Sequence, residues 1–224
     1  MKKGLNRLDI GLQKLADPFA FIEHCAKGKS VLNVGPAGGI DGYLPNNKDA
    51  WLHERIRCHA SELVGVDIDA KAIEYAASYN YEILNENCEK MALGKEFDLI
   101  VMSDVIEHVN APVTAINNLL SHLTEDGKLI ITTPNATAGN ILIRSLLHCE
   151  INVLADHVTT YYPEHFKAIC DRLHCTLDAV YMFDHKDKRT WSFRCKSALF
   201  QILTLISPRL ASSMLVVIQK KNNA

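Results

Sequence analysis

The chain has 224 residues, with 24 Lys and Arg against 26 Asp and Glu, and a formal net charge of −2 when histidine is neutral. This length suits one domain with a sizeable core, and the balanced charge argues against a nucleic-acid partner. The 7 cysteines include no C-x-x-C pair, so we expect no zinc knuckle or disulfide framework and a reducing, cytoplasmic location. We expect no signal peptide and no membrane span, because the longest uncharged run, residues 197–208, is too short to cross a bilayer.

A glycine-rich loop follows the first predicted buried strand. The apolar residues 31–34 lead directly into a turn that contains Gly35, Gly38 and Gly39. Glycine leaves room for a ligand to approach the backbone, so the turn is a candidate ligand cradle, although an ordinary tight turn has the same pattern. The polar residues 41–58 that follow include a tryptophan, and they are either a lid or substrate wall or a simple insertion.

An acidic residue ends the second predicted strand. Residues 63–66 are apolar and are followed by Asp67, Ile68 and Asp69. A carboxylate at the end of a strand beside a glycine loop can accept two hydrogen bonds from a ribose diol. Asp69 alone could equally cap the next helix. The order of the two features predicts a nucleoside-binding crevice.

Strands and helices continue to alternate in the middle of the chain. A weak strand at residues 81–84 leads into the polar loop 85–89, and residues 96–102 form the next buried strand. A helix with an apolar stripe follows, and then another strand at residues 128–133. This unbroken alternation over residues 30–134 predicts an α/β fold with a doubly wound parallel sheet.

Two more strands are predicted near the end of the chain, at residues 176–184 and 214–219. A helical and basic insertion at about residues 185–212 separates them, within a single domain that comprises residues 1–224. Its basic residues surround two aromatic side chains and precede an apolar helical face. Such a segment can lie on an anionic membrane or hold a lipid-linked substrate. The alternative is a helix that packs on the core or forms a dimer.

The glycine loop resembles motif I of the class I S-adenosylmethionine-dependent methyltransferases, D/E-x-G-x-G-x-G. Asn33, Gly35, Ala37 and Gly39 occupy the four defined places, so the acidic residue and the middle glycine are replaced. FDLIVMSDVIEHV, a helix and GKLIITTPN resemble the ubiquinone-biosynthesis O-methyltransferases and related small-molecule enzymes over residues 31–135. The resemblance implies a Rossmann-like, seven-stranded, mostly parallel sheet with an antiparallel last strand.

The resemblance also implies a cofactor, S-adenosylmethionine, and a product, S-adenosylhomocysteine. In this family the glycine loop approaches the methionine end, the acidic strand tip binds the ribose, and the later polar loops contact the adenine and the acceptor side. Cysteine in the adenine loop is expected to pack rather than react. The expected cofactor-binding residues are Asn33, Gly35, Pro36, Ala37, Gly39, Asp67, Ile68, Asn87, Cys88, Ser103 and Asp104.

His108 is the expected catalytic base, since a histidine with an ordinary pKa of about 6.5 can deprotonate a hydroxyl near neutral pH. His157 is the second candidate, and either ring could instead bind a backbone carbonyl. Asp104, Glu107 and His108 also fall at i, i+3 and i+4, as in some O-methyltransferases that bind magnesium through E-x-x-E-H. His157 could add a ligand. Related proteins without a metal carry the same E-H pair, so we expect no metal.

The sequence therefore predicts a methyltransferase that acts on a small-molecule or a lipid- or glycan-linked acceptor, with oxygen as the expected acceptor atom. Peripheral membrane contact and the choice between monomer and homodimer are left open. One alternative is a degenerate protein that binds the cofactor without catalysis, as the substitutions at Asn33 and Ala37 suggest. The other is a nicotinamide-dependent oxidoreductase on a similar sheet.

Overall fold

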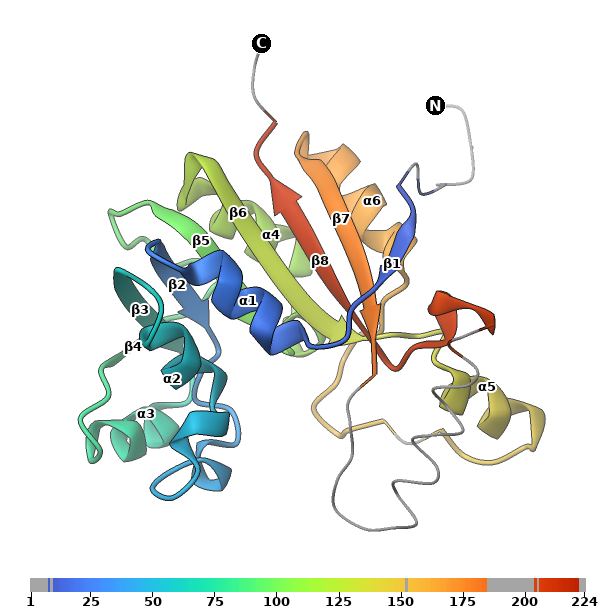
Figure 1. Ribbon diagram of the computed structural model, residues 1–224, viewed down its shortest axis with the longest axis horizontal. Coiled ribbons are helices and arrows are strands. Elements are labelled where there is room, and N and C mark those ends of the chain that lie inside the picture. Colours follow the sequence, from blue (N-terminus) through green and yellow to red (C-terminus); the bar gives the residue numbers. More distant parts are fainter. Residues whose placement is uncertain (1–7, 9, 152, 185–203, 205, 222–224) are drawn as a thin grey trace.

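One mixed sheet forms the centre of the computed structural model, which describes residues 8, 10–151, 153–184, 204 and 206–221. Its strands are β1 (Leu12–Lys14), β2 (Ser30–Val34), β3 (Glu62–Asp67), β4 (Ile83–Asn85), β5 (Phe97–Ser103), β6 (Leu123–Pro134), β7 (Thr176–Phe183) and β8 (Ser213–Gln219). These 8 strands lie in the order β1-β7-β8-β6-β5-β2-β3-β4 (Figure 1). All neighbours are parallel except that β8 is antiparallel to both β6 and β7.

The predicted fold class is confirmed. The sheet is doubly wound, mostly parallel, and its last strand is antiparallel. The order of the strands reverses at β2, with β3 and β4 on one side of it and β5 and β6 on the other. Ligands of such sheets bind beyond the carboxyl ends of the strands at this point. The sheet holds one strand more than expected, because the 3 residues of β1 are too few for an alternating pattern to be visible.

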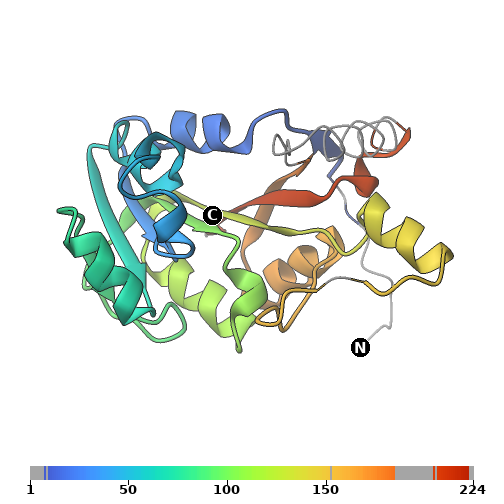
Figure 2. The same ribbon diagram turned by 90° about the horizontal axis from the view of Figure 1, so that it is seen from below.

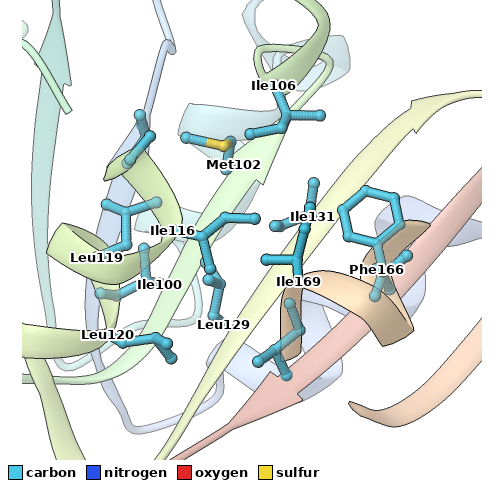
Figure 3. Packing of buried hydrophobic residues seen from close by; sticks show 14 of the residues in the cluster. Ile100, Met102, Ile106, Ile116, Leu119, Leu120, Leu129, Ile131, Phe166 and Ile169 are labelled. Atoms are coloured by element: carbon cyan, nitrogen blue, oxygen red, sulfur yellow. The ribbon is translucent and has the colours of Figure 1, made fainter. Parts of the chain in front are cut away.

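Helices cover both faces of the sheet, because its central strands are apolar on both sides. The helices are α1 (Pro18–Ala26), α2 (Leu52–Arg57), α3 (Ala70–Ala77), α4 (Pro112–Ser121), α5 (Gly139–Leu146) and α6 (Pro163–Leu173). In β5, Leu99 and Val101 pack with α1 and α2, whereas Ile100 and Met102 point to the opposite face. There they meet α4 and α6 (Figures 2 and 3).

The two predicted C-terminal strands are confirmed as β7 and β8. Residues 185–203 of the expected basic insertion lie outside the described residues. The chain is described again continuously from residue 206, where the short 3₁₀ helix η4 (Pro208–Leu210) leads into β8. Among the described helices, none combines the length and the apolar character that crossing a bilayer requires.

Candidate functional site

A cavity of about 470 Å³ lies beyond the carboxyl ends of β2, β3 and β5, where the order of the strands reverses. Its wall comes from the glycine loop, the end of β3, the loops after β4 and β5, and one residue from a distant loop. Ligand pockets for small molecules have volumes of this order. The lining residues are Val34, Gly35, Gly38, Val66, Asp67, Ile68, Asp69, Glu86, Asn87, Cys88, Glu89, Asp104, Val105, His108, Val109, Asn110 and Asp156.

Gly35 begins the turn that forms one wall of the cavity. Its φ of 74° lies in the left-handed region, and its N–H donates a 2.8 Å hydrogen bond to the carbonyl of Val66. A side chain at this position would also clash with Cγ2 of Val105. Both conditions require glycine. Of the expected cofactor-binding residues in this loop, Pro36, Ala37 and Gly39 do not line the cavity. Gly38 does line it, although the sequence placed Gly38 only in the turn and not among the cofactor-binding residues.

The segment 41–58 supports the glycine loop from behind. Trp51 is buried, and its indole N–H donates a 2.8 Å hydrogen bond to the carbonyl of Pro36. Its ring also packs edge-on against Tyr81, with centroids 4.8 Å apart. Trp51 is buried and does not line the cavity, so it is not part of a substrate wall, which was one of the two interpretations of this segment. The segment instead supports the glycine loop.

Asp67 connects the end of β3 to the glycine loop. Its Oδ2 accepts a 2.8 Å hydrogen bond from the backbone N–H of Ala37, and its Oδ1 accepts a 3.0 Å bond from the N–H of Asp69. An ionised carboxylate has about four acceptor positions, so each oxygen retains one for a further donor. Asp67 faces the cavity, and the neighbouring Ile68 lies on the cavity rim with 71% of its surface exposed.

Asn33 lies beneath the loop and away from the cavity. Its buried side-chain amide is 3.1 Å from Nδ1 of His53. Burial lowers the pKa of His53 to about 4, so the imidazole is neutral at pH 7. A neutral ring whose Nδ1 has a lone pair accepts from the amide N–H, whereas a carboxylate at position 33 has no proton to donate. The asparagine that stands in place of the acidic residue of motif I therefore suits its histidine partner.

The loop after β4 closes the adjacent side of the cavity. Asn87 and Cys88 both line it, and Oδ1 of Asn87 accepts a 2.8 Å hydrogen bond from the N–H of Glu89. Burial, with a further contribution from Glu89, raises the pKa of Cys88 to about 11, so its thiol is protonated and unreactive near pH 7. Glu89 Oε1 also accepts 3.1 Å hydrogen bonds from the N–H groups of Asn110 and Ala111. The sequence did not predict this connection between the two loops.

The side chains of Ser103 and Asp104 point in different directions at the end of β5. Asp104 lines the cavity and has a φ of 52°, in the left-handed region. Its backbone N–H donates to the carbonyl of Thr132 at 3.0 Å, which holds this conformation. Such backbone strain is found preferentially at functional sites. Ser103 instead turns toward β6, where its hydroxyl lies 2.8 Å from that of Thr132, and it does not line the cavity.

His108 lines the cavity within the 3₁₀ turn η3 (Ile106–His108). Its Nδ1 is 3.2 Å from the backbone carbonyl of Asp156 and 3.3 Å from the Oδ2 atom of the same residue. Both of these oxygens are acceptors, so the neutral ring carries its proton on Nδ1 and its lone pair on Nε2. Asp156 is 48 residues away in the chain, and nothing in the sequence pointed to it.

Glu107 is a buried carboxyl group directly beside this histidine. It is only 1% exposed, and Oε2 accepts a 3.0 Å hydrogen bond from the hydroxyl of Thr133. Oε1 is also buried and has no hydrogen-bond partner among the described residues. Burial raises the pKa of Glu107 to about 7, and the nearby Asp104 and Asp156 add to the shift. An unsatisfied buried oxygen is costly and calls for an explanation.

Glu107, His108 and His157 form a cluster in which one ligand atom from each residue lies within 4.8 Å of the others. Asp104, which the sequence placed in the candidate metal set, is not a member of this cluster. Imidazole nitrogen and carboxylate oxygen are common ligands of Zn²⁺ and similar ions. The unpartnered Oε1 of Glu107 fits such an ion, because it is an acceptor that the described protein leaves unsatisfied.

Comparisons with known proteins agree with this geometry. Residues 8–180 match a family model described as a methyltransferase domain. The mitochondrial ubiquinone biosynthesis O-methyltransferase of Schizosaccharomyces pombe is 26% identical over 149 residues, which is 62% of this chain and 48% of that protein. The chain thus spans about half the length of the curated relatives that it matches.

Solved structures share the fold. A SAM-dependent methyltransferase from Archaeoglobus fulgidus superimposes with a TM-score of 0.59 at 16% identity, over 90% of both chains. The N-methyltransferase NodS from Bradyrhizobium japonicum WM9, solved in complex with S-adenosyl-L-homocysteine, has a TM-score of 0.55 at 14% identity. That match covers 91% of this chain and 84% of NodS.

The buried Glu107 makes a prediction about stability. Its folded-state pKa of about 7 lies above the ordinary value of 4.5, so its contribution to stability is present below pH 4.5 and is lost as the pH rises through 7. Glutamine does not ionise, so the Glu107→Gln variant does not lose this stability as the pH rises. The free energy of unfolding of the variant, relative to wild type, should rise by roughly 2–3 kcal/mol between pH 5 and pH 8. Urea unfolding in EDTA measures it.

Glu62→Gln is the matched control, because this glutamate is exposed at the start of β3. The free energy of unfolding of this variant is measured at the same pH values. Parallel curves for Glu107→Gln and wild type would show that Glu107 does not titrate in this interval.

Proposed function

The chain belongs to the class I S-adenosylmethionine-dependent methyltransferases, and on this premise we propose that it transfers a methyl group from S-adenosylmethionine to an oxygen of its acceptor. The observation that carries the proposal is the Asp67 carboxylate, which joins the glycine loop on the wall of a 470 Å³ cavity. This arrangement has both parts of an adenosyl site: open backbone for the amino-acid end and a carboxylate for a diol.

Each wall of the cavity suits one part of the cofactor. Gly35 and Gly38 give close access to the methionine end, and Asp67 has acceptor positions left for two ribose hydroxyls. The exposed Ile68 supplies an apolar surface for the adenine ring, beside Asn87 and Cys88. We assign Asn33, Pro36, Ala37, Gly39 and Ser103 to the shape of the site, since they do not line the cavity.

His108 is proposed as the base that removes the proton of the acceptor. S-adenosylmethionine supplies a methyl group already activated on a sulfonium, so the protein has to align the acceptor and accept its proton. Asp156 holds the proton on Nδ1 of His108, leaving Nε2 to take the acceptor proton. The Asp156 carboxylate then stabilises the charged imidazolium. This requirement for a base favours oxygen as the acceptor atom.

A divalent cation at Glu107, His108 and His157 is the second candidate mechanism. It is favoured by the buried Oε1 atom of Glu107, which has no hydrogen-bond partner in the described part of the chain. When bound, the cation would polarise the acceptor oxygen as a Lewis acid. The two histidines and the carboxylate would hold it, and His108 would then be a ligand instead of a base. The two mechanisms make different predictions for chelation and for Glu107.

Exposed apolar residues in α5 and in the segment after it support an acceptor with an apolar part. This surface, which we call the α5 surface, consists of Leu142, Leu146, Leu147, Ile151, Val153, Leu154 and Val158. It continues along the chain through Asp156 and His157, which lie at the cavity and at the histidine cluster. Large exposed apolar surfaces commonly mark a site of membrane or ligand contact. We therefore propose a lipid-linked acceptor that is presented by a membrane surface.

Removal of the Asp67 carboxylate should weaken cofactor binding. Asp67→Ala is expected to raise the Kd for S-adenosylhomocysteine at least tenfold. The variant loses the two hydrogen bonds to the ribose hydroxyls and the hydrogen bond from the N–H of Ala37 that holds the glycine loop. Calorimetry measures the Kd. Asp98→Ala is the control, since its carboxylate also binds a neighbouring strand, at the N–H of Ser30, but at the amino edge of the sheet.

An unchanged Kd for Asp67→Ala would rule out the ribose assignment. The nicotinamide-dependent alternative is tested in the same preparation by thermal shift, because a ligand stabilises the protein that binds it. Stabilisation by S-adenosylhomocysteine and not by NADH is expected, and the reverse result would favour the oxidoreductase.

The two mechanisms are separated by variants and chelation. With His108 as base, His108→Ala should lower kcat at least 100-fold with little change in cofactor Kd, and EDTA should have no effect. With a bound cation, EDTA should abolish turnover, and Glu107→Gln and His157→Ala should be as damaging as His108→Ala. Turnover is measured with a panel of phenolic and lipid-linked acceptors. His59→Ala, which changes an exposed histidine in the turn after α2, is the control.

Cofactor binding without turnover of any acceptor would favour the degenerate alternative. Equal losses of kcat and cofactor affinity in His108→Ala would instead give this histidine a structural role.

The lipid-linked acceptor predicts binding to membranes. The wild-type protein should sediment with vesicles of phosphatidylcholine and phosphatidylglycerol, and the double variant Leu146→Asp/Leu147→Asp should bind at least tenfold more weakly. These leucines are 70% and 68% exposed, so the variant should fold. Leu84→Asp, an exposed leucine on the edge strand β4, is the control. Absence of sedimentation would exclude a membrane-presented acceptor and would leave the methyl transfer itself untouched.

A further inference from the structure

Two cysteines meet at the C-terminal end of α6, at the opposite edge of the sheet from the cavity. The helix ends at Leu173 and is followed by His174, which has a φ of 55°. The N–H of Cys175 donates a 3.0 Å hydrogen bond to the carbonyl of Cys170. This is the backbone bond of a Schellman motif, whose two bonded residues commonly contact each other through their side chains. Cys175 also packs against the buried cluster that contains Cys170. The turn thus fixes two thiols side by side.

The pair is chemically asymmetric. The interaction between the two thiols lowers the pKa of Cys175 and raises the pKa of Cys170, and burial adds to the rise at Cys170. Cys170 is buried, whereas Cys175 is partly exposed. Since the thiolate is the reactive form of cysteine, Cys175 is the nucleophile of the pair and Cys170 is the second thiol.

A cavity gives small molecules access to both sulfurs. Its volume is about 300 Å³, and Cys170 and Cys175 both line it together with His174, Lys167 and Lys221. Asp171 lines the cavity too, and its carboxylate is paired with the Lys167 ammonium. This cavity shares no lining residue with the candidate active site.

We propose that Cys170 and Cys175 form a redox-sensitive dithiol that hydrogen peroxide converts into an intramolecular disulfide. The Cys175 thiolate attacks one peroxide oxygen and the O–O bond breaks, which gives a sulfenic acid at Cys175 and releases hydroxide, which is protonated to water. The sulfur of Cys170 then attacks the sulfenic sulfur, and the S–O bond breaks as the S–S bond forms. The proton of Cys170 leaves with the departing hydroxyl as a second water. Two thiols are oxidised by two electrons, and one peroxide is reduced.

The proposal is independent of the methyltransferase activity. Other thiols reduce an accessible disulfide by thiol–disulfide exchange, so the disulfide would be a reversible modification of this protein. The disulfide would also covalently join the end of α6 to the residue that immediately precedes β7.

Peptide mapping tests the proposal on the full chain. Trypsin places Cys170 in the peptide 168–172 and Cys175 in the peptide 173–186. After brief treatment with stoichiometric peroxide and blocking of free thiols, these two peptides should be recovered linked, with a mass loss of two hydrogens, and dithiothreitol should separate them. The exposed Cys58 and Cys149 should remain as blocked thiols at the same dose.

Three variants sharpen the test. Cys170→Ser should leave a sulfenic acid on Cys175 that dimedone traps, whereas Cys175→Ser should leave Cys170 unmodified, because Cys175 reacts first. Cys25→Ser, which changes a half-buried cysteine of α1, should still give the linked peptides. The proposal is wrong if wild-type protein gives no linked peptides, if Cys175 pairs with a different cysteine, or if Cys58 and Cys149 are oxidised before Cys175.

Discussion

The hydrogen bond between the Asp67 carboxylate and the backbone N–H of Ala37 is the contact on which the site depends. It joins the end of β3 to the loop after β2, and these two strands are already aligned by the pairing of Val34 with Val66. The positive φ of Gly35 turns the chain so that the N–H of Ala37 reaches the carboxylate. One short bond therefore fixes the loop, the orientation of the carboxylate and the cavity between them.

The buried polar groups beneath the site differ in whether all their hydrogen-bonding atoms have partners. Asn33 and His53 satisfy each other, and burial keeps the imidazole neutral, so this pair needs nothing from outside the protein. Glu107 has one partner, Thr133, and its second oxygen has none among the described residues. Because an unsatisfied buried acceptor is expensive, the first pair is structural and the second group is the one suited to a proton or an ion.

The departures from motif I have a structural explanation. Ala37 contributes its backbone N–H to Asp67, and its side chain is buried in the small cluster that also contains Ile40 and Trp51. A methyl group therefore fills space at this position instead of blocking the cavity. Asn33 donates to a neutral histidine, which an acidic residue does not do. The two replacements are consistent with a formed site, and the buried Trp51 helps to hold its loop.

The sequence by itself determined the alternation of strands and helices, the glycine turn and the acidic residue at the end of β3. These features depend on local patterns: apolar runs that must be buried, glycine at a positive φ, and the rule that parallel strands end at the same edge. Only the tertiary structure decided which side chains complete the site. His53 is 20 residues from Asn33, and Asp156 is 48 residues from His108, so no local pattern connects them. Packing and the hydrogen-bonding requirements of buried polar atoms determine such partners. Both arise only when the chain has folded.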